Sequence, residues 1–233
     1  MRISCDESVP VANEAEVLDE LLRLDGARVL DLGCGKADKT RLVAQRAASV
    51  LGLEVDESQL AKNRSIDDLP NVRFERGGAQ RIPAQDAEFD IVLMFKSLHH
   101  VPTEHMDAAF TEIRRVLRPG GVAYISEPVF AGAFNDILRL FHDERTVREA
   151  AFAAEQRAVS SGMLSLLTQR FFLQPMHFGD FAQFEDQVLK VTHTEHRLSE
   201  EVFKEVRTRF AGHMTSDGAT FHMPIRVDLF ARA

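Results

Sequence analysis

The segment VLDLGCGKADKT, residues 29–40, decides the fold of this chain of 233 residues. An apolar run ends at Asp31, Gly33 and Gly35 follow one residue apart, and Asp38 stands where a helix would begin. This pattern is typical of a buried strand that turns sharply into a helix, where glycines let a ligand approach bare backbone. The segment alone leaves three possibilities open: a corner for a pyrophosphate, a corner for another ligand, or a tight turn.

Strands and helices are predicted to alternate on both sides of this corner. The predicted strands are 27–33, 49–54, 71–78, 89–95 and 121–128. The predicted helices are 13–26, which begins with a capping box of Asn13 and Glu16, 39–48, one that Asp56 and Gln59 cap, and one within 103–121. Alternation over short connections predicts an α/β fold with a Rossmann-like, doubly wound and mostly parallel sheet, whose ligands lie at the carboxyl ends of the strands.

The chain changes character after Pro128, where long helical stretches and most of the phenylalanines occur. Helices are predicted at 134–161, 180–191 and 199–212, and an antiparallel pair of edge strands at 165–178 and 221–233. No linker marks a second domain, so we expect one domain over 1–233, with a cofactor-binding half at 1–130 and acceptor-pocket helices and edge strands at 131–233. The phenylalanines have two interpretations, core packing or an aromatic lid over the strand ends.

Composition limits the classes of partner. A formal net charge of -8 argues against binding to the phosphates of DNA or RNA, and no dense Lys or Arg run is present. The apolar runs are far shorter than the roughly 20 residues that a membrane-spanning helix needs. The first residues lack the apolar core of a signal peptide, and Cys5 and Cys34 form no disulfide framework. We therefore expect a cytoplasmic monomer or homodimer that acts on a small molecule, without nucleic acid or membrane partners.

The corner departs from the dinucleotide fingerprint G-x-G-x-x-G, because Asp38 stands at the position of the last glycine. A carboxylate suits the N-terminus of a helix but competes with a pyrophosphate for the same amides. No G-x-x-x-x-G-K-[ST] loop for ATP or GTP is present either. Glu54 ends the second predicted strand, where a carboxylate accepts both hydroxyls of a ribose. Together these residues indicate an adenosine ligand without phosphates, although Glu54 alone is more often a surface acid.

Four ordered motifs resemble one known family: VLDLGCGKADKT, GLEVDESQL, IPAQDAEFDIVLMFKSLHHVP and EIRRVLRPGGVAYISEPV. Together they resemble the class I S-adenosylmethionine-dependent methyltransferases, especially the methyltransferase type 11 subgroup related to quinone biosynthesis. The resemblance covers about residues 25–130. It implies a seven-stranded sheet whose last strand runs antiparallel, and S-adenosylmethionine as the cofactor. It places Asp31, Gly33 and Gly35 beside the methionine part of the cofactor and Glu54 on its ribose, and a zwitterionic methionine tail explains why Asp38 is tolerated.

The resemblance extends the candidate cofactor site along the strand ends. The predicted cofactor-binding residues are Asp31, Gly33, Cys34, Gly35, Glu54, Val55, Ala79, Gln80 and Phe95. After the third strand the family usually has Gly-Asp-Ala, whereas this chain has Gly77-Gly78-Ala79. The acid expected near the adenine amino group is therefore missing, and Gln80 or backbone atoms could substitute. We expect cofactor binding to be retained but weaker.

Candidate catalytic groups follow the fourth strand in FKSLHHVP. His99 and His100 could act as a base near neutral pH, and Lys96 could orient an acidic acceptor. The alternatives are a histidine that braces the loop and a solvated lysine. Glu127 and Phe130, after the fifth strand, are candidate acceptor residues, with a helix cap as the alternative for Glu127. The Asn/Asp-Pro-Pro-aromatic motif of amine and amide methyltransferases is absent.

We expect no catalytic metal. Some quinone O-methyltransferases have Glu-x-x-Glu-His in this region, which supports a divalent ion, whereas Lys96, His99 and His100 stand here and an ammonium group would repel it. His193, Glu195 and His196 could form a local metal site, but unconnected surface histidines are the commoner explanation. Cys34, between two glycines, is interpreted as a small side chain packed in the turn rather than a reactive thiol.

The sequence therefore predicts an enzyme that transfers a methyl group from S-adenosylmethionine to an O, S or C nucleophile of a small-molecule acceptor. Three rivals remain: an enzyme that uses a modified S-adenosylmethionine, a non-catalytic or regulatory module that binds the cofactor, and a nucleotide-sugar or NAD enzyme. Release of S-adenosylhomocysteine distinguishes turnover from binding alone.

Overall fold

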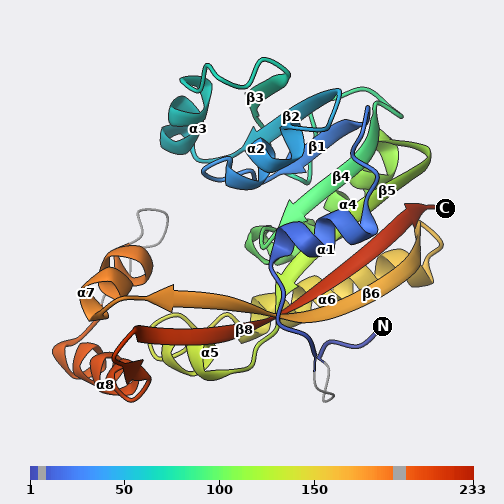
Figure 1. Ribbon diagram of the computed structural model, residues 1–233. Helices are drawn as coiled ribbons and strands as arrows, with labels where there is room; N and C mark the ends of the chain where they lie inside the picture. The colour runs from blue at the N-terminus through green and yellow to red at the C-terminus, as the bar shows by residue number, and fades with distance from the viewer. Residues whose placement is uncertain (5–8, 191–197) are drawn as a thin grey trace.

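The apolar runs on either side of the glycine corner form the middle of one sheet in the computed structural model, which describes residues 1–4, 9–190 and 198–233. The strand order is β3-β2-β1-β4-β5-β8-β6, and β7 pairs with β8 (Figure 1). The strands are β1 (Arg28–Leu32), β2 (Ser49–Glu54), β3 (Val72–Arg76), β4 (Phe89–Phe95), β5 (Leu117–Pro128), β6 (Leu164–Phe178), β7 (Met214–Thr215) and β8 (Gly218–Arg232). The predicted α/β sheet is confirmed, and the two-residue β7 adds to the seven strands expected.

Strand directions follow the prediction. The five strands from β3 to β5 run parallel to one another, while β8 runs antiparallel to both β5 and β6. The order reverses between β1 and β4, which is the topological switch point where ligands bind in open α/β sheets. The segment predicted at 165–178 and the one at 221–233 do form an antiparallel pair at the sheet edge. The β5–β8 register places Glu127 opposite Arg226.

Helices cover both faces of the sheet. They are α1 (Glu14–Leu21), α2 (Asp38–Ala44), α3 (Glu57–Arg64), η1 (Leu98–His100), η2 (Thr103–His105), α4 (Met106–Val116), α5 (Ala133–Leu138), α6 (Arg145–Ser160), α7 (Phe181–Phe184), η3 (Glu185–Leu189) and α8 (Glu200–Ala211). Apolar side chains of α1 and α2 pack with one face in one buried cluster, and those of α4 and α6 pack with the other face in a second. The predicted capping box between Asn13 and Glu16 is present at α1.

The predicted helix over 134–161 is wrong in one respect, because it consists of α5 and α6 with a break at 139–144. Glu144 lies in the N-cap position of α6 but its side chain does not cap the helix. Instead one carboxylate oxygen of Glu144 contacts Arg148 and the other contacts His142. The break therefore places a buried carboxylate beside η1, which matters for the site described below.

The phenylalanines of the C-terminal part form a core of their own. Phe134, Phe178, Phe184, Phe210 and Phe221 are buried together where β6 and β8 extend beyond the parallel strands (Figure 1). Their rings meet mostly edge to face, with centroids 4.9 to 6.4 Å apart. This arrangement supports the core-packing interpretation over an aromatic lid.

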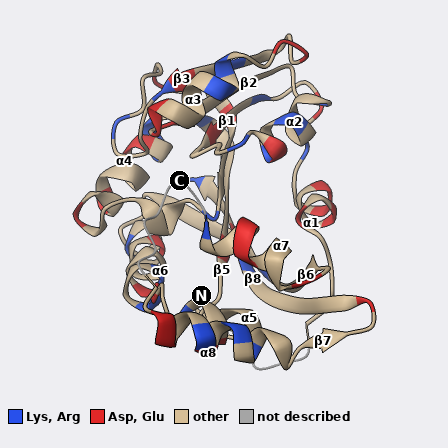
Figure 2. Ribbon diagram, turned by 90° about the vertical axis from the view of Figure 1, so that its left-hand side faces the viewer, with Lys and Arg blue, Asp and Glu red and all other residues tan. Residues whose placement is uncertain are grey.

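Charged residues of both signs are interspersed on α3, α6 and α8 (Figure 2). Within the described ranges, no helix combines the length and the apolar composition that crossing a membrane requires.

Candidate cofactor and acceptor site

The glycine corner lies between the carboxyl ends of β1, β2 and β4. Gly33 has φ +74°, and a Cβ there would stand 2.8 Å from the Cβ of Ser97, so only glycine fits. The amides of Gly33 and Cys34 both donate to the carbonyl of Leu53, at 2.9 and 3.0 Å. Ser97 Oγ donates to the carbonyl of Leu32 at 2.7 Å. The loops that leave β1 and β4 are therefore tied together at the switch point.

Glu54 is the hydrogen-bonding centre of this corner. Its Oε2 accepts the Gly35 amide at 2.9 Å, and its Oε1 accepts the amides of Val55 and Asp56 at 2.8 and 2.9 Å. These donors hold the carboxylate in one orientation at the end of β2. Each oxygen retains acceptor capacity, so the arrangement suits a carboxylate that also receives hydroxyl groups. Val55 itself is 62% exposed.

Asp31 is a fully buried carboxylate at the end of β1. Its Oδ2 accepts the hydroxyl of Thr40 at 2.6 Å, while Oδ1 has no hydrogen-bond partner among the described residues. Burial raises the pKa of Asp31 to about 6; the Thr40 hydrogen bond opposes this shift and the nearby Glu54 charge adds to it. A buried acceptor atom without a donor is costly, which is expected where a ligand supplies the missing donor.

Asn63 on α3 is a corner residue that the sequence reasoning missed. Its Nδ2 donates to the carbonyl of Gly35 at 2.7 Å and contacts Cys34 Sγ at 3.5 Å. The spacing of Gln59 and Asn63 was a usable signal, since their side chains hydrogen-bond one helical turn apart. Cys34 is buried, and burial raises its pKa above the ordinary range, which agrees with a packed thiol.

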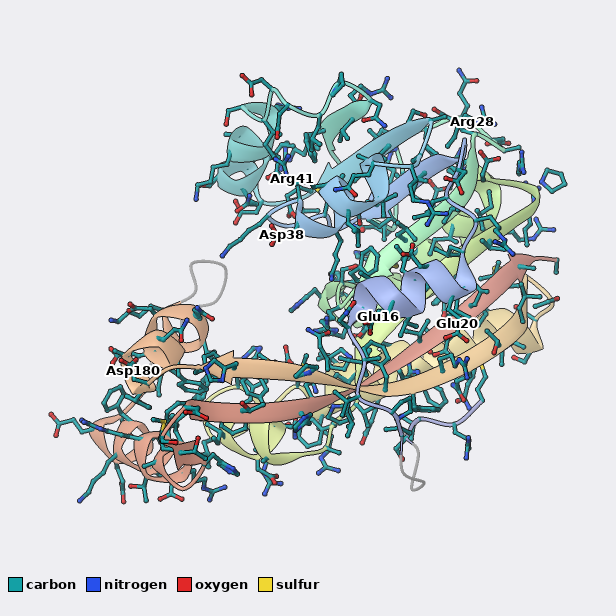
Figure 3. The ribbon with its side chains drawn as sticks, in the orientation of Figure 1. Glu16, Glu20, Arg28, Asp38, Arg41 and Asp180 are labelled. Carbon is teal, nitrogen blue, oxygen red and sulfur yellow. The ribbon has the colours of Figure 1, made fainter. Side chains whose placement is uncertain are left out.

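The first turn of α2 differs from the expected cap. Ala37, with φ +65°, occupies the N-cap position and makes no side-chain hydrogen bond there, while Asp38 is the first helical residue. Figure 3 shows Asp38 at the start of α2 and Arg41 further along the same helix. Asp38 therefore acts on the helix dipole from the first turn rather than as a cap.

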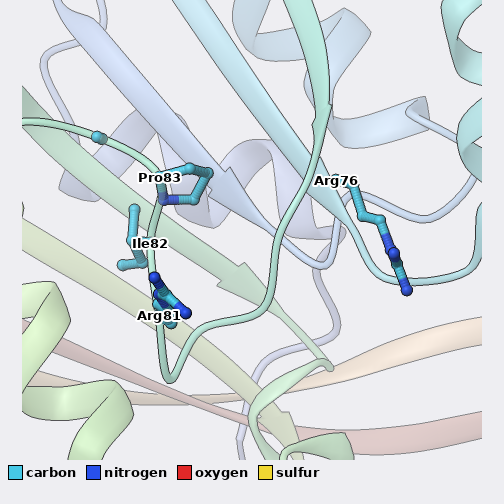
Figure 4. Close-up of a pocket in the computed structure, with 5 residues that line it drawn as sticks. Arg76, Arg81, Ile82 and Pro83 are labelled. Carbon is cyan, nitrogen blue, oxygen red and sulfur yellow. The ribbon is translucent and has the colours of Figure 1, made fainter.

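The loop after β3 brings Gly78 and Gln80 together. A Cβ on Gly78 would meet Gln80 Oε1 at 2.6 Å, so the amide of Gln80 occupies the space that a side chain at position 78 would need. Ala79 is buried beside it. The same loop borders a cavity of about 500 Å³ lined by Arg76, Arg81, Ile82, Pro83 and Ala84 (Figure 4).

Lys96 lies at the end of β4 with φ +53°, a left-handed conformation that is uncommon outside glycine. Its Nζ contacts Glu14 Oε2 at 2.9 Å and Gln174 Oε1 at 3.0 Å. Glu14 is buried at the start of α1 and also accepts the hydroxyl of Tyr124 at 3.1 Å. Lys96 is thus engaged with α1 and β6, while Phe95 before it packs on the ring of Tyr124.

His99 lies buried between two carboxylates. Its Nδ1 is 2.5 Å from Glu127 Oε2, and its Nε2 is 3.6 Å from Glu144 Oε1. Burial lowers the pKa of His99, but the neighbouring Glu127 and Glu144 carboxylates outweigh it and raise the pKa to about 9. His99 therefore carries a proton on both nitrogens at neutral pH in this arrangement. His100 is exposed, and its ring centroid lies 4.1 Å from that of His99.

Glu127 also fixes η1 through the backbone, because its Oε1 accepts the Leu98 amide at 3.0 Å. The helix-cap alternative for Glu127 is therefore wrong, since its side chain is directed to η1 rather than to α5. Glu127 and Phe130 both line a cavity of about 170 Å³. Arg145, Arg148 and Arg226 line the same cavity, and the Arg145 guanidinium lies 4.5 Å from the Phe130 ring centroid.

Most of the predicted residues fall into two groups at the carboxyl ends of the parallel strands. The corner group contains Asp31, Gly33, Cys34, Gly35 and Glu54 around the ends of β1 and β2. The second group contains His99, His100, Glu127 and Phe130 around the ends of β4 and β5. His193, Glu195 and His196 lie outside the described residues.

Comparison with known proteins finds similarity to one class of enzyme, the methyltransferases. Residues 29–121 match the family model of a methyltransferase domain. The match covers less than half of the chain, and residues 29–121 are thus similar to that family's domain, within a sheet of the Rossmann-like methyltransferase order.

Individual relatives agree with this class. An uncharacterised methyltransferase of Synechocystis is 34% identical over 105 residues, which are 45% of this chain and 49% of that protein. The demethylmenaquinone methyltransferase of Staphylococcus saprophyticus is 33% identical over 110 residues, 46% of each chain. This chain thus spans about half the length of these relatives. A solved structure of a methyltransferase from Bacillus halodurans superposes with TM-score 0.67 at 16% identity, covering 94% of this chain and 98% of that one, which shows a shared fold.

Proposed function

We propose that this chain transfers a methyl group from S-adenosylmethionine to an O, S or C nucleophile of a small-molecule acceptor. The observation that carries the proposal is the unpartnered Oδ1 of the buried Asp31 beside the glycine corner. A carboxylate at this position attracts the ammonium group of an amino-acid tail and repels a pyrophosphate. Glu54, held by three amides at the end of β2, is placed to accept ribose hydroxyls.

The residues of the corner would hold the cofactor, and bound S-adenosylmethionine would supply a methyl group activated by a sulfonium. The protein then contributes mainly alignment of the acceptor, which is worth about 7 to 11 kcal/mol in favourable cases. We assign that alignment to the cavity lined by Glu127, Phe130 and Arg145. We infer that residues 131–233 belong to the same domain and shape this acceptor side.

His100 is the better candidate for a proton acceptor than His99. The pKa of His99, raised to about 9, leaves only a small fraction of neutral imidazole at pH 7, and both of its nitrogens face carboxylates. His100 is exposed on the same 3-10 turn. Lys96 is engaged with Glu14, so we assign it to the support of α1 rather than to the acceptor.

A quinone-like aromatic acceptor is the finer form of the proposal. It is supported by the motifs that resemble the quinone-related subgroup and by the demethylmenaquinone methyltransferase among the relatives. The Phe130 ring beside Arg145 in the acceptor cavity is compatible with a flat, electron-rich ring.

Two measurements test the proposal. Calorimetry should show binding of S-adenosylmethionine and S-adenosylhomocysteine and none of NAD or ATP; preference for NAD would overturn it. Incubation with S-adenosylmethionine and a panel of quinols, phenols, thiols and carbon acids should release S-adenosylhomocysteine. Binding without release for every acceptor would instead favour a non-catalytic module. His100→Ala should lower turnover with cofactor affinity intact, while His105→Ala, a change of an exposed histidine nearby, should alter neither.

A further inference from the structure

Two histidines of η1 and one acid at the start of α6 converge beside the acceptor cavity. One ring nitrogen each of His99 and His100 and one oxygen of Glu144 lie within 4.8 Å of one another. We propose that these three side chains bind a first-row transition-metal ion of the Zn²⁺ type. The proposal concerns binding by the protein itself and does not depend on methyl transfer.

The distance between His99 and Glu144 suits two ligands of one metal ion better than a direct hydrogen bond. His99 Nε2 and Glu144 Oε1 are 3.6 Å apart, beyond the range of a good hydrogen bond. Two ligands of a tetrahedral zinc ion, with bonds of about 2.0 to 2.1 Å, are separated by about 3.4 Å. Imidazole nitrogens select ions such as Zn²⁺ over Mg²⁺ or Ca²⁺, which prefer oxygen ligands.

The surroundings resemble the outer partners that metal ligands need. Metal-binding histidines donate their second nitrogen to a carboxylate, and ligating carboxylates are themselves hydrogen-bonded. His99 Nδ1 is 2.5 Å from Glu127 Oε2, so Nε2 faces Glu144 and would release its proton to solvent when it binds the ion. Arg148 contacts Oε2 of Glu144 at 2.5 Å and leaves Oε1 on the histidine side. His142 Nε2, 2.9 Å from the same Oε1, adds a third imidazole at the rim.

The expectation of no metal rested on Lys96, and the structure removes that reason. The ammonium of Lys96 lies 2.9 Å from Glu14, on the face of the sheet that α1 covers. The segment with Glu144 leads into α6, whose apolar side chains pack on the opposite face. The lysine therefore does not point at the three candidate ligands.

The test is a titration of the full chain, stripped with EDTA and desalted, with Zn²⁺ by calorimetry and with Co²⁺ by visible absorption. It is run in a His193→Ala/His196→Ala background, because that histidine pair offers zinc another place to bind. We expect about one equivalent of Zn²⁺, and a Co²⁺ spectrum with nitrogen and oxygen ligands. No stoichiometric binding in this background would overturn the proposal and leave His99 in a simple ion pair with its two acids.

Variants identify the ligands. His100→Ala should weaken Zn²⁺ binding by at least about tenfold. Glu127→Gln, which removes the charge beside His99 and keeps an oxygen for the Leu98 amide, should weaken it by about 10- to 100-fold. His105→Ala removes an exposed histidine of η2 and should leave affinity unchanged. Equal affinity of the His100→Ala variant and its parent would overturn the assignment, and circular dichroism confirms that each variant is folded.

Discussion

Asp31→Asn should make the free protein more stable and its cofactor binding weaker. The carboxylate is fully buried, and Oδ1 lacks a partner among the described residues. Asparagine keeps the shape of the side chain and an oxygen for the Thr40 hydroxyl, but it carries no charge. The substitution therefore separates the cost of a buried charge from the packing of β1.

The magnitude follows from the pKa of Asp31, which burial chiefly raises from 3.8 to about 6. A shift of about two units corresponds to about 3 kcal/mol, as an order of magnitude. The folded state binds the Asp31 proton more tightly than the unfolded state does. Proton binding therefore stabilises the folded state fully below the unfolded pKa of 3.8, and this stabilisation is lost as the pH rises through about 6. At pH 7.5 the variant should thus gain about 1 to 3 kcal/mol in free energy of unfolding, and at pH 4 the gain should nearly vanish.

Cofactor affinity should change in the opposite direction. Loss of a hydrogen bond to a charged group costs about 1.5 to 3 kcal/mol, so Kd for S-adenosylhomocysteine should rise about 10- to 150-fold. Urea denaturation at the two pH values and calorimetry at pH 7.5 measure both effects. Asp38→Asn, a change of an exposed acid on α2, is the matched control. It should neither raise the free energy of unfolding at pH 7.5 nor raise the Kd for S-adenosylhomocysteine. An Asp31→Asn variant that is no more stable at pH 7.5, or that binds as tightly as the parent, would refute the reasoning.

Three other substitutions test separate parts of the site. Glu54→Gln replaces an acceptor that holds three amides and should weaken S-adenosylhomocysteine binding by about 1.5 to 3 kcal/mol by calorimetry; unchanged affinity in a folded variant would place the ribose elsewhere. Gly78→Asp should change the free energy of unfolding in urea by no more than about 0.5 kcal/mol, because the atom that its Cβ meets at 2.6 Å is the end of the exposed Gln80 side chain, which can turn away; a loss above about 1 kcal/mol, recovered in Gly78→Asp/Gln80→Ala, would show that Gln80 is held in place. Lys96→Met removes an ammonium group from the buried Glu14 and should cost about 1 to 3 kcal/mol in urea, since the lysine side chain is partly exposed and Tyr124 still donates to Glu14; Lys96→Met/Glu14→Gln should be more stable than the single variant, and equal stability would show that the pair is not coupled.

The cofactor half of the fold could be predicted because its elements are specified locally. β2 and β4 have the bounds that their apolar runs predicted, and the capping box at Asn13 forms as expected. Ends of helices were less predictable: α1 stops at Leu21, five residues before the glycine at which the pattern ended. The chain is already extended at Leu22, with φ -120° and ψ 147°, and the apolar spacing does not mark this change.

The break at 139–144 could not be predicted for a different reason. The predicted helix ran through this segment without interruption, but Glu144 contacts Arg148 in the next turn and faces His99 from a distant part of the chain. A contact between residues so far apart in the chain cannot be recognised from local residue spacing. The proposed acceptor side of the site depends on this contact between Glu144 and His99. Arg148 and Glu144 were therefore absent from the predicted residues, although their spacing of four was visible in the sequence.

The left-handed Lys96 connects the N-terminal helix to the acceptor side. Gly33 cannot bear a side chain because Ser97 packs on it, and Ser97 in turn bonds the end of β1, so the chain must turn sharply at Lys96. A non-glycine residue in this conformation costs about 1 to 3 kcal/mol and persists only where its surroundings fix it. The Glu14 carboxylate supplies such a contact from α1. Because η1 begins two residues after Lys96, the position of His99 and His100 depends in part on a helix that lies outside the matched segment 29–121.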